Sequence, residues 1–353
     1  MKTRNKGVLN AIAERLITPA WKLAPSALLA FLVAGQIASG QEPVAEPAIR
    51  QATLFNTPEA DAVVARLQVF PRDNPWNADV SQWPVHPNSV AIVASIGNDK
   101  PLRCNSDMGY VLVPPGQKRI DVAIVGYPDE SDKGPYPVPE NTPIEGWPKS
   151  YTTDGGEGRP KLEDIQRDTR GEDGDRHAIV VDPAAMKLYE FYQMRRTDRG
   201  WQCACAAIFD LKSNELRPDG WTSSDAAGLP IFPAIIRHDE LKAGEIKHAL
   251  RVTVRNSRRA YVAPATHFAS SKTDPNLPRM GERLRLKADV DIHGFSPELQ
   301  TIATALKKHG MLVADNGIEW ALSSAPDERI PSLHEALRKV KGSMFEVVER
   351  PAR

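Results

Sequence analysis

The chain has 353 residues, of which 45 are basic and 45 are acidic, so its formal net charge at pH 7 is zero. A nucleic-acid-binding surface is basic, and the balanced charge therefore argues against a nucleic-acid partner. Thirty prolines and 23 glycines, with an aromatic content of 7%, indicate many turns and long ordered loops. This composition favours a β fold over a helical bundle. The sequence has no glycine-rich phosphate loop, and we expect neither a cofactor nor a metal.

The first 40 residues have the features of a secretory signal peptide. An uncharged, largely apolar run, Leu23–Ile37, is followed by the small residues 38–40. Signal peptidase recognises a cationic stretch, a short apolar core and small residues in this order, which places cleavage near Gly40–Gln41. The run is shorter than the roughly 20 residues that cross a bilayer, and an uncleaved anchor is the alternative. We expect a secreted or periplasmic monomer that does not contact the membrane after cleavage. The cations before the run are Lys2, Arg4, Lys6, Arg15 and Lys22.

Beyond the cleavage site, residues 41–55 have the composition of a linker, and residues 56–353 are long enough for a single β-rich domain. Thr57 and Pro58 form an N-cap and first-turn pair that predicts a short helix. A polar segment with little periodicity covers 128–176, and connections of this length are usually functional loops or insertions.

Strand patterns dominate the middle of the chain. The segments 187–194 and 201–211 flank the polar turn RRTDRG, and 248–254 and 259–268 flank RNSR, so we predict two hairpins. Within 283–294 the apolar residues alternate with charged ones, which predicts one face toward the core and one toward water. The predicted strands, in chain order, are 89–97, 110–115, 120–127, 177–182, 187–194, 201–211, 248–254, 259–268 and 283–294.

The C-terminal part predicts two helices and a further hairpin. Ser296 is an N-cap before Pro297, and Gly310 ends this helix. The segments 311–315 and 318–324 surround an Asn–Gly turn, the strongest short hairpin signal. Leu333, Leu337 and Val340 mark the last helix. The expected fold class is mainly β, a two-sheet sandwich or jelly roll with two or three peripheral helices.

Several long segments resemble one group of secreted bacterial proteins. They are GDRHAIVVD, LYEFY, AIFDLKSNELRPDGWTSSDAAGLPIFP, HALRVTV and DPNLPRMGERLRLKA, with PWNADVS, PNSVAIVASIG and ALKKHGMLVADNG outside them. The group is an uncharacterised family of exported proteins with a GWTS-DAAGLPI-P type motif, often joined to sugar-binding or other surface modules. The resemblance covers nearly all of the mature chain and implies secretion and a single domain.

Three cysteines are present, Cys104, Cys203 and Cys205. The last two lie two positions apart on a predicted strand, where Cα atoms are about 6.5–7 Å apart, at the limit for a disulfide. We therefore expect a disulfide from Cys104 to one of them, with a cysteine metal site as the alternative. The resembling proteins tend to have Gly or Ser at 203 and 205, which makes these cysteines a local feature.

The first candidate site is a pair of carboxylates. Glu190 lies mid-strand among aromatic residues, and Asp210 ends the strand predicted to pair with it. Two carboxyls on neighbouring strands suit glycoside hydrolysis, and an acid among aromatic rings can have the raised pKa of a general acid. The structural alternative is that Glu190 pairs with an arginine and Asp210 caps the following turn.

The second candidate site is the segment GWTSSDAAGLPIFP at 220–233, which has neither helix nor strand periodicity. A loop held by glycine and proline is a natural binding site. Trp221 would stack on a sugar face, while Asp225 and Ser223 would bind hydroxyl groups. The alternative is a buried loop in which Asp225 accepts from backbone amides.

The histidines at predicted strand ends form the third candidate. His177, His248 and His267 would lie near one another if the strand ends are adjacent, although no metal-ligand spacing joins them. His177 follows the long loop, and as a general base with Glu190 it would suit a lyase as well as a hydrolase. Structural roles, with each ring bonded to backbone or carboxylate, are the alternative.

Together these patterns predict a secreted carbohydrate-active protein, a polysaccharide hydrolase or lyase that uses paired acid and base side chains. A non-catalytic glycan- or envelope-binding module is the second hypothesis, and a structural envelope protein is the third. An enzyme needs two titratable groups at one cleft, whereas a binding module needs aromatic rings and hydrogen bonds on an open face. The expected partner is a glycan or polysaccharide.

Overall fold

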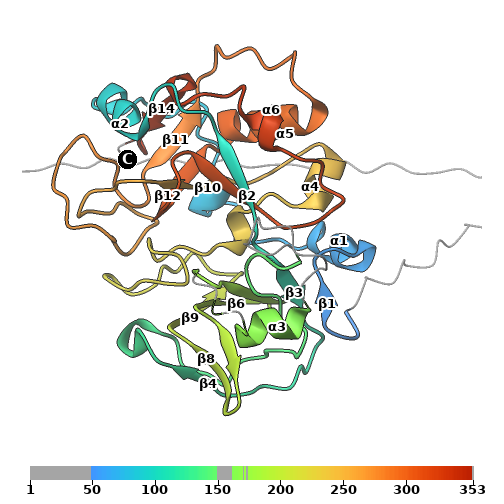
Figure 1. The fold of residues 1–353 in the computed structure, drawn as a ribbon. Coiled ribbons are helices and arrows are strands. Elements are labelled where there is room, and N and C mark those ends of the chain that lie inside the picture. The colour runs from blue at the N-terminus through green and yellow to red at the C-terminus, as the bar shows by residue number, and fades with distance from the viewer. Residues whose placement is uncertain (1–48, 149–160, 170, 172–173, 352–353) are drawn as a thin grey trace, which may run out of the picture. The chain divides into compact units, whose positions relative to one another are not determined.

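The structure is a computed structural model, shown in Figure 1, and it describes residues 49–148, 161–169, 171 and 174–351. The expected signal peptide, its cleavage point and residues 41–48 of the expected linker lie outside the described residues. Residues Ala45–Arg353 form one compact unit. Within the described ranges, no helix is both long enough and apolar enough to cross a membrane.

The expectation of a mainly β fold is confirmed, because the described residues contain fourteen strands in three sheets and six α-helices. The first sheet has five strands in the order β1-β3-β5-β6-β9. β3 and β5 are parallel and the other neighbours are antiparallel. These strands are β1 (Thr53–Leu54), β3 (Tyr110–Leu112), β5 (Ala178–Asp182), β6 (Lys187–Tyr192) and β9 (Cys205–Asp210).

The second sheet has six strands in the order β14-β11-β12-β10-β13-β2. β12 runs parallel to β10, and β2 runs parallel to β13 at the edge of the sheet. A β-bulge shifts the register of β10 against β12 between Val252 and Thr253. The strands are β2 (Arg103–Ser106), β10 (Leu250–Val254), β11 (Arg283–Leu286), β12 (Met311–Asn316), β13 (Ala321–Ser324) and β14 (Phe345–Val348).

A small third sheet and short helices complete the unit. The sheet has the order β4-β8-β7, with β4 (Val122–Ile124), β7 (Arg195–Thr197) and β8 (Gly200–Cys203). Helix α2 contacts β14, α5 contacts β11, α6 contacts β2 and α3 contacts β7. The helices are α1 (Pro58–Val64), α2 (Ser89–Ile96), α3 (Leu162–Arg167), α4 (His238–Ala243), α5 (Pro297–Lys308) and α6 (His334–Leu337), and the 3₁₀ helices are η1 (Pro75–Asn77), η2 (Pro128–Glu130), η3 (Phe232–Ala234) and η4 (Gly342–Met344).

The five-stranded sheet is buried on both faces. One face contributes Val181 and Leu188 to an apolar core that also contains Leu250 and Val252 of the six-stranded sheet. The other face contributes alternate residues, such as Phe191, to a second cluster with the three-stranded sheet. This burial explains why the segments of β5 and β6 are apolar at consecutive positions. The segment predicted as a long loop at 128–176 contains η2 and α3, and Tyr136, Val138 and Ile144 pack in the second cluster.

The helix predictions at both ends of the unit are confirmed. Thr57 caps α1 by accepting from the Ala60 amide, and Ser296 caps α5 by accepting from the Leu299 amide. The last predicted helix is α6, within the segment marked by Leu333, Leu337 and Val340.

The prediction of a strand at 89–97 is wrong, because this segment is the helix α2. Its buried residues are Ser89, Ile92, Val93 and Ile96, which is helical spacing, whereas Val90 is 84% exposed. An apolar run of this length does not distinguish a strand from a buried helix by composition.

Two predicted hairpins are also wrong. β12 and β13 are separated in the sheet by β10, so the Asn316–Gly317 turn does not join neighbouring strands. The segment 259–268 contains no strand and only one isolated bridge, from Tyr261 to Met280. The single strand predicted at 201–211 is two strands, β8 and β9, in different sheets.

The strand predicted at 283–294 is limited to β11. Asp289, Asp291 and His293 beyond it are exposed as predicted, but the two charged residues of β11 do not face water. Arg283 and Arg285 are buried because their guanidinium groups donate to backbone carbonyls of the segment 75–83. Long cationic side chains are buried when fixed acceptors satisfy them, and periodicity alone does not show such acceptors.

The predicted disulfide is not formed, because all three cysteines are free. Cys104 is in β2 of the six-stranded sheet, whereas Cys203 and Cys205 are in β8 and β9. Burial raises the pKa of Cys203 to about 12, so its thiol behaves as a small buried hydrophobe.

Candidate functional site

A polar cluster joins the five-stranded sheet to the six-stranded sheet, and we call it the seam cluster. Figure 1 shows the two sheets as separate groups, with β10 and β12 in one and β6 and β9 in the other. The cluster has six members. Arg251 lies in β10 and Asp315 lies in β12, both in the six-stranded sheet, and Asp107 follows β2. His177 precedes β5, and Glu145 and Asp225 lie on connecting segments.

Arg251 and Asp225 form the best-defined ion pair of the seam cluster. Arg251 Nε lies 2.9 Å from Asp225 Oδ2, and Nη2 lies 2.7 Å from Oδ1. The third nitrogen, Nη1, donates to the Ser323 hydroxyl at 2.6 Å. The Asp225 side chain is 0% exposed and that of Arg251 is 3% exposed. This fork geometry fixes the guanidinium firmly.

His177 is held as a cation by two acceptors. Its Nδ1 lies 2.8 Å from Glu145 Oε2, and its Nε2 lies 2.8 Å from the carbonyl oxygen of Ser224. A carboxylate and a carbonyl both accept, so both ring nitrogens carry protons. Burial alone would lower the pKa of His177, but the charge and hydrogen bond of Glu145 raise it to about 10. His177 therefore has no free lone pair for a general base.

Backbone hydrogen bonds connect these groups into one network. The Asp107 amide donates to the Ser324 carbonyl, and the Asp107 carbonyl accepts from the Gly146 amide. The neighbouring Glu145 amide donates to the His177 carbonyl at 2.8 Å. Asp107 is therefore bonded directly to β13 through Ser324, and it is linked to the residue before β5 through Glu145 and Gly146.

The Asp107 carboxyl has an unsatisfied atom. Its Oδ1 is buried and has no hydrogen-bond partner among the described residues. Burial, followed by the charge of Glu145, raises the pKa of Asp107 to about 7, although Arg251 and His177 oppose the shift. A buried polar atom without a partner is rare and costs about 1–3 kcal/mol, so Oδ1 is open to a hydrogen bond from water or from a bound molecule.

Asp315 is the second carboxyl with a raised pKa. It lies at the bulge of β12 opposite Thr253, and its Oδ1 accepts from the Asn316 amide at 2.6 Å. Burial and the charge of Asp225 raise the pKa of Asp315 to about 8, again against Arg251 and His177. Asp107 and Asp315 therefore share two cationic neighbours and both hold protons near neutral pH.

One edge of the seam cluster reaches the surface. Tyr192 at the end of β6 is half-buried, Asp175 is exposed, and Tyr127 is 46% exposed. Burial raises the pKa of Tyr192 to about 12, and the charges of Asp175 and Asp315 add to this shift. Asp315 is thus within electrostatic range of a tyrosine near the protein surface.

Glu190 has a different environment from the one expected of a catalytic acid. It is 0% exposed, and its carboxylate accepts from the Ile231 amide at 2.9 Å and from the Phe232 amide at 2.8 Å. Burial raises its pKa to about 7, while the two amides lower it. Glu190 therefore holds the end of the 220–233 loop against β6 and does not face a cleft.

Asp210 cannot pair with Glu190. Lys187 is the residue opposite Asp210 in the β6–β9 ladder, and its Nζ lies 2.9 Å from Asp210 Oδ2. Lys187 and Glu190 are three residues apart in one strand, so their side chains point to opposite faces of the sheet. The Lys212 amide and Lys187 lower the pKa of Asp210. The two predicted carboxylates are thus on opposite faces.

The 220–233 loop is largely buried. Asp225 forms the Arg251 pair described above, and the Ser223 hydroxyl is 2.6 Å from the Leu229 carbonyl. Trp221 is half-buried, with the Arg217 guanidinium 5.6 Å from its ring centroid. The loop is therefore buried, as in the structural alternative, but the Asp225 carboxylate binds Arg251 and not backbone amides. Trp221 keeps an accessible part.

The two other histidines have fixed partners. His248 bonds the Glu240 carboxylate at 2.7 Å and the Ala249 carbonyl at 2.9 Å. His267 donates from Nδ1 to the Ala226 carbonyl at 2.8 Å and stacks on Phe268. Neither shares a ligand atom cluster with His177 among the described residues. These contacts match the structural roles given as the alternative.

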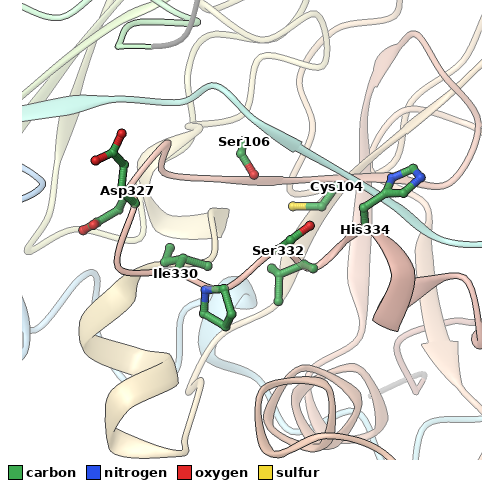
Figure 2. Close-up of a pocket in the computed structure, with 9 residues that line it drawn as sticks. Cys104, Ser106, Asp327, Ile330, Ser332 and His334 are labelled. Carbon is green, nitrogen blue, oxygen red and sulfur yellow. The ribbon is translucent and has the colours of Figure 1, made fainter.

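A polar pocket of about 460 Å³ lies beside β2 and α6, and Figure 2 shows residues that line it. In this view the Cys104 sulfur and the His334 imidazole point in opposite directions, so they do not form a nucleophile and base pair. Burial raises the pKa of Cys104 to about 11, which excludes a thiolate near neutral pH. The pocket can hold a small polar molecule but offers no covalent chemistry through Cys104.

One side-chain group in the described part of the chain has the spacing of a metal site, namely Asp61, His238 and Asp327. Its carboxylates already bind a cation, because Arg329 lies 2.7 Å from Asp61 and 2.5 Å from Asp327. This guanidinium supplies the positive charge that a metal ion would bring, and the group is a salt-bridge network.

The sequence contained one signal for the seam cluster. Arg251 interrupts the apolar strand 250–254, and Asp315 ends an apolar strand. A charged residue inside a buried strand needs a partner, so these positions indicate a buried polar site. Asp107 and Glu145 lie in irregular segments, where no periodicity distinguishes them.

No protein-family model, curated protein or solved structure matches this chain.

Proposed function

We propose that this protein is an exported carbohydrate-active enzyme, a polysaccharide hydrolase or lyase, with Asp107 and Asp315 as its acid and base. One observation carries the proposal: two carboxyls, Asp107 after β2 and Asp315 in β12, lie in electrostatic range of the same cations, Arg251 and His177, and both hold protons near neutral pH. Such matched and perturbed carboxyls are characteristic of functional sites.

The chemistry follows from the two carboxyls. Cleavage of a glycosidic bond needs one group that gives a proton to the leaving oxygen and one that removes a proton from water or from a sugar carbon. A carboxyl with a pKa of about 7 or 8 is partly protonated and partly ionised at neutral pH, so it can serve in either role. Their neighbours Arg251 and His177 are fixed cations, which stabilise negative charge that develops in the reaction.

The choice of a glycan as substrate is supported by the sequence. The signal-peptide pattern within residues 1–40 supports export, and the proteins that the sequence resembles often carry sugar-binding modules. Tyr192 and Tyr127 at the surface edge of the seam cluster are side chains on which sugar rings pack. We also propose a two-sheet sandwich, since side chains of both larger sheets share one apolar core.

A polysaccharide screen tests the proposal. The purified mature chain is incubated with neutral and acidic polysaccharides, and both reducing ends and the ultraviolet absorbance of unsaturated uronates are measured, which separates hydrolysis from elimination. Asp107→Asn and Asp315→Asn keep the side-chain shape and remove the titratable proton. Each should lower turnover by about 10²–10⁴-fold, the usual contribution of general acid–base catalysis.

Asp289→Asn is the matched control, because Asp289 is an exposed aspartate outside the seam cluster. It should retain full turnover. If no polysaccharide is cleaved but some are bound, the protein is a glycan-binding module and not an enzyme. If both Asn variants are folded and as active as the wild type, the acid–base assignment is wrong.

A further inference from the structure

A second cavity, of about 490 Å³, lies beside Arg283 of β11 and Leu312 of β12 and shares no residue with the seam cluster. Its size is within the range of small-molecule sites in proteins. Apolar and charged side chains share its wall. The apolar lining includes Trp83, Leu216, Pro264 and Leu312, and the charged lining consists of Arg279, Arg283, Arg350, Asp73, Glu282 and Glu349.

Arg283 is the unusual member of this lining. Its side chain donates to the His309 carbonyl at 2.6 Å and to the Pro75 carbonyl at 2.7 Å, and its guanidinium lies 5.4 Å from the centroid of the Trp83 ring. Arg283 is 4% exposed, yet no carboxylate in the described part of the chain forms an ion pair with it. Burial without such a partner lowers the pKa of Arg283 to about 9.

Two neighbouring arginines have the carboxylate partner that Arg283 lacks. Arg285 lies two residues along the same strand, donates to the Val80 and Trp83 carbonyls, and pairs with Glu346 at 2.6 Å. Arg279, also in the cavity wall, pairs with Glu282 at 2.7 Å. A buried cation without a counter-ion is costly, so an anion that enters the cavity would be bound at this point.

Gly281 allows the segment 262–264, another part of the cavity wall, to approach closely. Gly281 has φ +79°, and a Cβ at this position would lie 2.0 Å from the Val262 carbonyl oxygen. The Val262 amide donates to the Met280 carbonyl at 2.9 Å, and the Gly281 amide donates to the Val313 carbonyl at 2.7 Å. The segment 262–264 is thereby fixed against β12, and the cavity is preformed.

We propose that this cavity binds a ring-shaped organic carboxylate, with the carboxylate on Arg283 and the ring against Trp83 and Pro264. The Arg283 Nε–H makes no hydrogen bond among the described residues and remains available as a donor. A planar guanidinium recognises a carboxylate well, and indole and proline surfaces pack on the apolar face of a ring. The ligand is a uronate unit of a glycan or an aromatic acid, which share this chemistry. The proposal does not depend on the activity of the seam cluster.

Calorimetric titration of the mature protein tests the proposal and separates the two sources. The probes are digalacturonate and benzoate, with methyl galactoside and benzamide as their neutral counterparts and inorganic phosphate as a simple anion. One carboxylate probe should bind at least about tenfold more tightly than its neutral counterpart, because the neutral probe leaves Arg283 unpaired. Equal binding of phosphate would mean an adventitious ion only and would overturn the proposal.

Variants assign the binding to these residues. Arg283→Lys keeps the charge but loses the planar fork, and Trp83→Leu removes the ring surface; each should weaken the carboxylate probe about tenfold. Arg338→Lys is the matched control, because Arg338 is an exposed arginine outside the cavity, and it should bind as the wild type does. If Arg283→Lys does not fold, Trp83→Leu decides the question, since it leaves Arg283 in place. Unchanged affinity in either folded variant, or no carboxylate binding in the wild type, would overturn the proposal.

Discussion

The substitution Glu190→Gln tests whether Glu190 is a catalytic acid or a residue that positions the 220–233 loop. The wild-type carboxylate accepts from the amides of Ile231 and Phe232, and it is 0% exposed. The Gln carbonyl can keep Oε1 as acceptor for both amides, but its NH₂ group then faces the Ile231 amide and has no acceptor. An unsatisfied buried donor costs about 1–3 kcal/mol, so we expect the free energy of unfolding to fall by about 1–3 kcal/mol.

The pH dependence of this loss has a definite sign. Burial raises the pKa of Glu190 in the folded state to about 7 from an ordinary value near 4.5, so its contribution to stability is fully present below pH 4.5 and is lost as the pH rises through 7. Gln has no such dependence. The difference in stability between wild type and variant should therefore shrink from pH 5 to pH 8.

Urea unfolding at several pH values measures these differences, and turnover per folded molecule is measured in parallel. The positioning role predicts a less stable protein with nearly normal turnover. The reasoning would be refuted by a variant as stable as the wild type that has lost turnover, since such a result makes Glu190 the catalytic acid.

Three further predictions follow from the buried groups. Asp225→Asn leaves Arg251 buried without its carboxylate and should cost about 3–5 kcal/mol in urea unfolding, whereas adding Arg251→Met should restore part of the loss; equal stability of all three proteins would contradict the pair. The free energy of unfolding should fall as the pH rises from about 4 through 8, because the folded state raises the pKa of Asp107 to about 7 and of Asp315 to about 8; the doubly Asn-substituted protein should show a flatter curve, and an identical curve would argue against these shifts. Cys203 should resist thiol reagents in the native protein and react only on unfolding, since it is buried; a disulfide found by mass mapping would contradict this.

The local elements that could be predicted are those with complete end signals. Thr57 before Pro58 and Ser296 before Pro297 each predict a helix start, because an N-cap side chain and a proline satisfy the first turn locally. The strands at 178–182 and 187–192 were also predictable, since both of their faces are buried in apolar clusters.

Long-range pairing was not predictable from the sequence. The Asn316–Gly317 dipeptide has the composition of a hairpin turn, yet β10 occupies the place between β12 and β13. A parallel strand inserted between two sequence neighbours leaves no local signal, because its position depends on the packing of the whole sheet.

The candidate site was predictable only in part for the same reason. Asp225 and His177 were identified from the sequence, and both lie in the seam cluster, but as fixed partners of Arg251 and Glu145. Asp107 lies some 200 residues from Asp315 along the chain. Only the tertiary structure places both carboxyls near Arg251.

The pH–rate profile of kcat/KM on the best polysaccharide substrate tests the acid–base assignment most directly. The account predicts a bell-shaped profile with both limbs near neutral pH, and the loss of one limb in Asp107→Asn and of the other in Asp315→Asn, each with a fall of about 10²–10⁴-fold at the optimum. A profile that keeps both limbs and its full height in either folded variant would contradict the account.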